Sequence, residues 1–140
     1  MISLLLLVVC VLFLISIIHV YWAFGGRWGA MVALPIKKGS QEPAFVPRKI
    51  GTLLVAFLLV VAAFLLLIKG IYLRNNVQEF NFFTLGCTVC AVVFLIRAIG
   101  DFKYVGFFKK IKHSQFARND TWLYSPLCLL ISLVYLFVLF

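Results

Sequence analysis

The stretch "IGTLLVAFLLVVAAFLLLIKGIYL", residues 50–73, decides the fold class of this chain. It is apolar almost throughout, and Lys69 is its one charged side chain. An apolar helix of about 20 residues is long enough to cross the hydrocarbon core of a bilayer. Water cannot satisfy backbone N–H and C=O groups there, so a spanning segment of this kind has to be helical. The stretch therefore predicts a transmembrane helix.

Three further apolar runs of comparable length occupy residues 2–24, 80–100 and 121–140. The whole chain of 140 residues is 65% hydrophobic and only 12% charged, whereas an average soluble domain is about half apolar and about a quarter charged. A small soluble domain could not cover so much apolar surface. We predict a single all-α domain over residues 1–140, an integral membrane protein with four transmembrane helices arranged as two hairpins.

The distribution of positive charge predicts the orientation in the membrane. The net charge is +9, from 13 basic and 4 acidic residues, and most of the basic residues lie in the connections 25–49 and 101–120. With four spans these two connections lie on the same side, and Lys- and Arg-rich loops are typically cytoplasmic. We expect a multi-pass protein of the cell membrane with both termini outside. The charge is then a loop feature, and we expect no nucleic acid partner.

The segment after the third span has its own periodicity. Tyr104, Phe107, Phe108 and Ile111 follow a spacing of i, i+3, i+4 and i+7, which is one face of a helix. The pattern predicts an interfacial amphipathic helix between the third and fourth spans, with its lysines on lipid phosphates. A helix docked on the other loops is the alternative. The predicted lipid-facing surface comprises Lys103, Phe107, Phe108, Lys109, Lys110 and Lys112.

The clearest ionic pair in the sequence lies at the end of the third span. Arg97 and Asp101 are four residues apart, so on a helix they can pair, and charges in a membrane usually face the protein interior. Together with His19 and Tyr124 they predict a polar pocket at the cytoplasmic end. The functional interpretation is a site for an anionic head group. The alternative is a structural clamp, in which Arg97 extends to the interface and Asp101 neutralises it.

The start of the fourth span can be interpreted in two ways. Asp120 is a favourable N-cap residue, and a helix that begins there would carry Pro126 just past its first turn, where it predicts a slight kink. Alternatively, a shorter helix starts at Ser125. We prefer the first interpretation, because the shorter helix would struggle to span the bilayer.

Other chemistries have weaker support in the sequence. Cys87 and Cys90 form a C-x-x-C motif, as in thiol oxidoreductases, but they lie in an apolar run without a nearby base and are ordinary packing residues there. His19 and His113 are the two histidines and offer poor axial ligands for a haem. We predict no cofactor and no metal site, and we assign no catalytic residue.

Three segments carry a resemblance: "HVYWAFGGRWG" (19–29), "RAIGDFKYVGFFKK" (97–110) and "FARNDTWLYSPLCL" (116–129). Through them the chain resembles a family of small, uncharacterised four-helix bacterial membrane proteins, grouped as a domain of unknown function. The resemblance implies the same number of spans and no established activity. It directs attention to His19, Tyr21, Trp22, Arg97, Gly100, Asp101, Arg118 and Asp120.

The sequence favours a membrane protein that binds an anionic lipid or lipid-linked head group at the cytoplasmic end. Two alternatives stay open: a small membrane enzyme that acts on a lipid or quinone with His19 and Asp101 as acid and base, and a structural subunit of a larger membrane complex. The expected partners are anionic membrane lipids, with a second copy of the chain or another membrane protein as the further candidates. The candidate ligand-binding residues are His19, Tyr21, Trp22, Arg27, Arg97, Asp101, Tyr104, Arg118 and Asp120.

Overall fold

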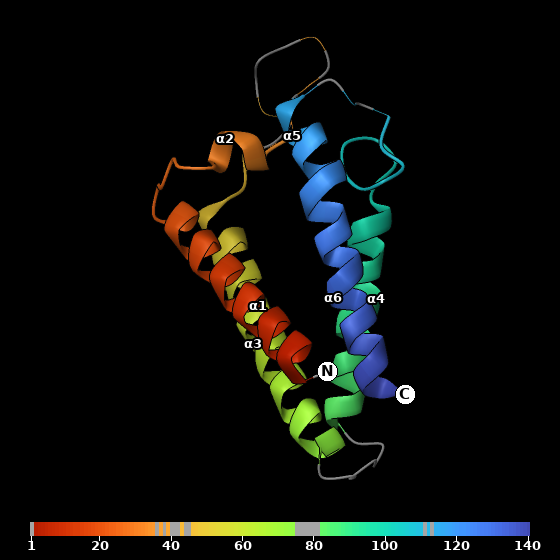
Figure 1. Cartoon of the computed structure of the whole chain (residues 1–140). Coiled ribbons are helices and arrows are strands. Elements are labelled where there is room, and N and C mark those ends of the chain that lie inside the picture. Colours follow the sequence, from red (N-terminus) through yellow and green to blue (C-terminus); the bar gives the residue numbers. More distant parts are fainter. Residues whose placement is uncertain are drawn as a thin grey trace.

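The structure is a computed structural model that describes residues 2–35, 37, 39, 43, 46–74, 82–110, 112 and 114–140. Its regular elements are helices: α1 (Ile2–Ala23), α2 (Ala30–Ala33), α3 (Lys49–Arg74), α4 (Phe82–Ile99), α5 (Gln115–Asn119), a π-helical turn η1 (Asp120–Tyr124) and α6 (Ser125–Leu139) (Figure 1). The last three form one continuous helix. Four helices, Ile2–Ala23, Lys49–Tyr72, Phe82–Ile99 and Gln115–Leu139, are long and apolar enough to cross a membrane. The prediction of an all-helical, multi-pass membrane protein is confirmed.

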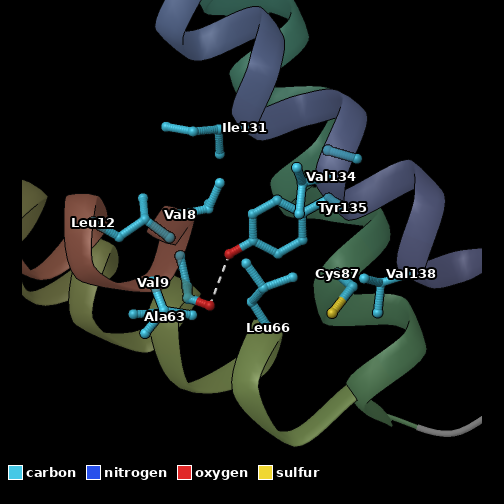
Figure 2. Close-up of a cluster of buried hydrophobic side chains, with 12 residues drawn as sticks. Val8, Val9, Leu12, Ala63, Leu66, Cys87, Ile131, Val134, Tyr135 and Val138 are labelled. Atoms are coloured by element: carbon cyan, nitrogen blue, oxygen red, sulfur yellow. Dashed lines mark hydrogen bonds between the residues drawn. The ribbon is translucent and has the colours of Figure 1, made fainter. Parts of the chain in front are cut away.

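The helices pack in two pairs. α1 lies along α3 and α6 lies along α4, and the beginning of α1 and the end of α6 lie at the same end of the molecule (Figure 1). The two pairs meet in the half of the spans nearer these chain ends, where side chains from all four helices form one apolar core (Figure 2). Its fully buried members include Val8, Leu12, Ala63, Leu66, Cys87, Ile131 and Tyr135.

Buried hydroxyl groups connect the helices. The Tyr135 hydroxyl donates to the Ala62 carbonyl at 2.7 Å, which ties α6 to α3 (Figure 2), and Ser132 donates to the Ala91 carbonyl at 2.8 Å, which ties α6 to α4. Ser16 similarly donates to α3 from α1. In a membrane the hydrophobic effect does not drive helices together, so packing and hydrogen bonds of this kind fix their relative positions.

The segment that follows α4 differs from the prediction. Residues 101–110 form bends and turns instead of an amphipathic helix, and Ile111 and His113 lie outside the described residues. Gly100 and Gly106 both adopt positive φ angles, 87° and 89°. A Cβ atom on Gly100 would overlap the backbone at Val105 and Gly106, and a Cβ atom on Gly106 would overlap the backbone at Ile99 and Gly100. The Phe107 N–H donates to the Ala98 carbonyl at 3.0 Å and closes the loop. The turns at Gly100 and Gly106 return the chain to the end of α4, so the residues with helical apolar spacing do not form a helix.

The fourth span also starts earlier than predicted. Ser114 is its N-cap, with the Ala117 N–H donating to the Ser114 hydroxyl at 3.0 Å, so the helix begins at Gln115 and not at Asp120. The Ser125 N–H bonds to the Asp120 carbonyl five residues earlier, which defines the π turn. The ring of Pro126 crowds the preceding turn of a helix, and we attribute the wide turn just before it to this crowding.

Candidate functional site

Asp120 is the centre of an ion cluster at the end of the bundle that carries the basic connections. Its carboxylate is fully buried and accepts from Arg97 Nη2 at 3.2 Å, from Lys109 Nζ at 3.0 Å and from the Gly106 N–H at 2.7 Å. We call Arg97, Lys109 and Asp120 the ion cluster. It joins the end of α4, the loop and the fourth span. Arg97 therefore pairs with Asp120 and not with Asp101, as the spacing had suggested.

Lys109 does not belong to the lipid-facing surface that was predicted for it, because its side chain is buried. Its ammonium donates to the Gly106 carbonyl at 3.0 Å, to Asp120 at 3.0 Å and to the Thr121 hydroxyl at 2.6 Å. An ammonium group has three N–H donors, and all three are used here. The turn at Gly106 directs Lys109 into the protein, so its role in the structure is to hold Asp120 and the loop together.

Arg97 is the member of the ion cluster with unused capacity. Its guanidinium carries five N–H donors. Nη2 bonds to Asp120, while Nη1 is buried and has no hydrogen-bond partner among the described residues. The side chain as a whole is 35% exposed, so other parts of it are in contact with the surroundings while Nη1 is buried. Two cations share one carboxylate, which leaves the ion cluster with an excess of one positive charge.

Asp101 organises the loop. It is exposed, and its Oδ1 accepts the backbone N–H groups of Lys103 at 3.0 Å, Tyr104 at 2.7 Å and Val105 at 2.9 Å. Burial alone would raise the pKa of Asp101, but these N–H groups together outweigh it and lower the pKa below its ordinary value. Hydrogen bonds to the charged form stabilise that form, so the ionised carboxylate keeps the loop closed.

The candidate residues on α1 form a separate group. His19 Nδ1 lies 2.8 Å from the Ile15 carbonyl; a carbonyl only accepts, so Nδ1 is the donor in this bond. Trp22 packs near His19 and donates its indole N–H to the Trp28 carbonyl, and the ring of Tyr21 lies against Gly26. Within the described part of the chain, no hydrogen bond or ion pair joins His19 to Asp101.

The other predicted residues lie on the surface at this end. Tyr104 is half-buried beneath the Lys103 ammonium, which lies 5.1 Å from its ring centre. The remaining side chains are exposed: Arg27, Phe107, Phe108, Lys110, Lys112 and Arg118. Thr121, Gly106 and Ser125 were not among the predicted site residues. Gly106 and Thr121 contact the ion cluster directly. Gly106 and Pro126 signal turns in the sequence, but they do not reveal which residues those turns bring together.

Comparison with known proteins places the chain by its sequence. No curated protein and no solved structure matches it. A family model matches residues 12–135, a range that includes the end of α1, the ion cluster and most of α6. The resemblance noted in the sequence is confirmed: the chain belongs to the family described as "Protein of unknown function (DUF3995)".

Proposed function

We propose that this protein binds an anionic lipid, or a lipid-linked head group, at the end of the bundle that carries the basic connections. The observation that carries the proposal is the state of Arg97. It is part of a cluster with excess positive charge, and one of its guanidinium nitrogens is buried without a partner. A guanidinium forms short, charge-assisted hydrogen bonds to phosphate oxygens. A phosphate at Arg97 would satisfy the free nitrogen and neutralise the excess charge.

The hydrogen bonds of the ion cluster assign different roles to its members. Lys109 has no donor left, and the Asp120 carboxylate already accepts three. Both therefore act as positioning residues that hold the Arg97 guanidinium. Because Nη1 has no partner among the described residues while Nη2 bonds to Asp120, an anion bound to Nη1 would leave the ion pair intact.

The surroundings of Arg97 suit an anionic leaflet. The exposed cations Lys103, Lys110 and Lys112 lie in the connection that follows α4, and the exposed Arg118 lies in α5. Each cation near an anionic surface contributes about 1 kcal/mol. Phe102 and Phe108 are more than half exposed beside them. In this proposal the connection faces the cytoplasm, as Lys- and Arg-rich connections do, and its aromatic rings lie at the acyl boundary.

The experiment is native mass spectrometry of the full chain in mild detergent, titrated with phosphatidic acid or with phosphatidylcholine. Wild type should retain discrete phosphatidic acid adducts in preference to phosphatidylcholine. Arg97→Gln should weaken phosphatidic acid binding by about tenfold or more, since a hydrogen bond to a charged group contributes about 1.5–3 kcal/mol. Circular dichroism and size exclusion would establish that the variant is folded.

Arg118→Gln is the matched control. It removes the same charge from the same end of the molecule, but from an exposed side chain. It should weaken binding by about fivefold at most, the effect of about 1 kcal/mol. Equal losses in the two variants would show that binding depends on surface charge and not on a site at Arg97, and the proposal would then be wrong.

A further inference from the structure

Ser125 is the second buried group without a hydrogen-bond partner. Of the side-chain nitrogen and oxygen atoms buried in the described part of the chain, two have no partner: Arg97 Nη1 and Ser125 Oγ. Ser125 is completely buried at the start of α6. Buried polar groups in native proteins are nearly always hydrogen-bonded, so an exception of this kind requires an explanation.

The packing register places Ser125 opposite Ala98 of α4, the residue that follows Arg97. Farther along α6, Ser132 donates to the Ala91 carbonyl of α4. Seven residues make two helical turns, so Ser125 lies on the same face as Ser132, and α4 runs antiparallel to α6 (Figure 1). Two turns beyond Ala91 on α4 is Ala98, which is buried and is the neighbour of Arg97 in the chain.

Ser125 does not make the bond that Ser132 makes, although the register places a carbonyl of α4 opposite it. The corresponding acceptor is the Ala98 carbonyl, which accepts the Phe107 N–H that closes the loop, and Ser125 Oγ has no partner among the described residues. The π turn adds a second constraint. The Ser125 N–H donates to the backbone carbonyl of Asp120, so Ser125 follows Asp120 by one wide turn. The side-chain carboxylate of the same Asp120 accepts from Arg97 Nη2.

We infer that Ser125 is a ligand-binding residue whose O–H donates to the same anionic oxygen that Arg97 Nη1 binds. This inference rests on the proposed function and identifies the ligand atom. Arg97 supplies charge and Ser125 supplies a directional hydrogen bond at a buried point between α4 and the fourth span. The ligand must present an acceptor there, such as an unsubstituted phosphate oxygen. The ammonium of a zwitterionic head group cannot serve, because a quaternary nitrogen has no lone pair with which to accept a hydrogen bond.

Ser125→Ala and Ser132→Ala form a matched pair that tests the inference. Both remove a buried serine hydroxyl from one face of α6, but only the Ser132 hydroxyl has a partner within the protein. In the full chain titrated with phosphatidic acid, Ser125→Ala should weaken binding about tenfold and leave the midpoint of thermal unfolding unchanged or higher. Ser132→Ala should keep the wild-type affinity and lower the midpoint.

The outcomes distinguish this inference from the proposed function. If Arg97→Gln weakens phosphatidic acid binding while Ser125→Ala binds like wild type, only the role of Ser125 is overturned. If wild type shows no preference for phosphatidic acid over phosphatidylcholine, the proposed function fails and the inference falls with it. A parallel titration with inorganic phosphate, in phosphatidylcholine nanodiscs, identifies the source of the oxygen. Binding that depends on Ser125 there would support a free anion, and binding of phosphatidic acid alone would support a lipid head group.

Discussion

Replacing Asp120 with asparagine is the sharpest test of the ion cluster. The substitution keeps the size of the side chain and removes the one negative charge that compensates Arg97 and Lys109. Arg97 can turn toward solvent, because its side chain is 35% exposed. Lys109 cannot, because its side chain is 1% exposed. Removing one partner of a buried ion pair costs about 3–5 kcal/mol, and we expect a loss of free energy of unfolding in that range.

The assay is reversible unfolding of the full chain in mixed micelles of a mild detergent and dodecyl sulfate, followed by circular dichroism. Lys109→Met should cost less than Asp120→Asn, because Asp120 then keeps Arg97 and the Gly106 N–H. The double variant should lose less than the sum of the two single variants, since the unpaired buried ammonium is gone. A loss of less than about 1 kcal/mol in Asp120→Asn would refute the reasoning, since a buried, uncompensated cation costs more than that.

Three further predictions follow from the loop and the core. Gly106→Ala should open the loop and expose it to proteolysis, because Gly106 has a φ of 89° and no room for a Cβ atom. The control is Gly51→Ala in α3, where a Cβ atom meets open space, and this variant should raise stability by up to about 1 kcal/mol. Similar proteolysis of both variants would contradict the role of Gly106 in closing the loop. The pKa of Asp101 is lowered in the folded protein. The ionised carboxylate therefore stabilises the loop fully above the ordinary pKa of about 4, and this stabilisation is lost as the pH falls through the pKa of the folded protein. Amide hydrogen exchange at residues 103–105 should therefore accelerate, relative to exposed amides, only below about pH 4, and Asp101→Asn should abolish this extra pH dependence. Tyr135→Phe should cost about 0.5–2 kcal/mol in mixed-micelle unfolding, because it removes the buried bond to Ala62, and an unchanged free energy would show that this bond is not stabilising.

The spans could be predicted because the bilayer constrains them through composition and length. The stretch 50–73 has one charge and became α3, and the run 2–24 became α1 with an end shifted by one residue. The start of the fourth span was misplaced, because its first turn, "QFARN", is polar. That turn is helical through a cap at Ser114 and contacts with the rest of the fold, which composition does not reveal.

The ionic pairing could not be predicted from spacing. Residues four apart face each other only while both are helical, and α4 ends at Ile99. Gly100 then takes a positive φ, and Asp101 turns to the backbone of its own loop. The carboxylate that reaches Arg97 is Asp120, 23 residues further along the chain. A pairing over that distance depends on how α4 packs against the fourth span.

Lys109 and Lys110 show how far a residue's role depends on backbone geometry. They are identical and adjacent, yet Lys109 is buried with all its donors used, while Lys110 is exposed. The turn at Gly106 decides which of them enters the protein. Gly106 also donates its own N–H to Asp120, so the closed loop and the ion cluster depend on each other. In the proposed site, stability and binding depend on different atoms: Lys109, Gly106 and Nη2 of Arg97 stabilise Asp120, and Nη1 of Arg97 is buried without a partner among the described residues. Substitutions at Lys109 should therefore change mainly the free energy of unfolding, and substitutions at Ser125 mainly the affinity for an anion.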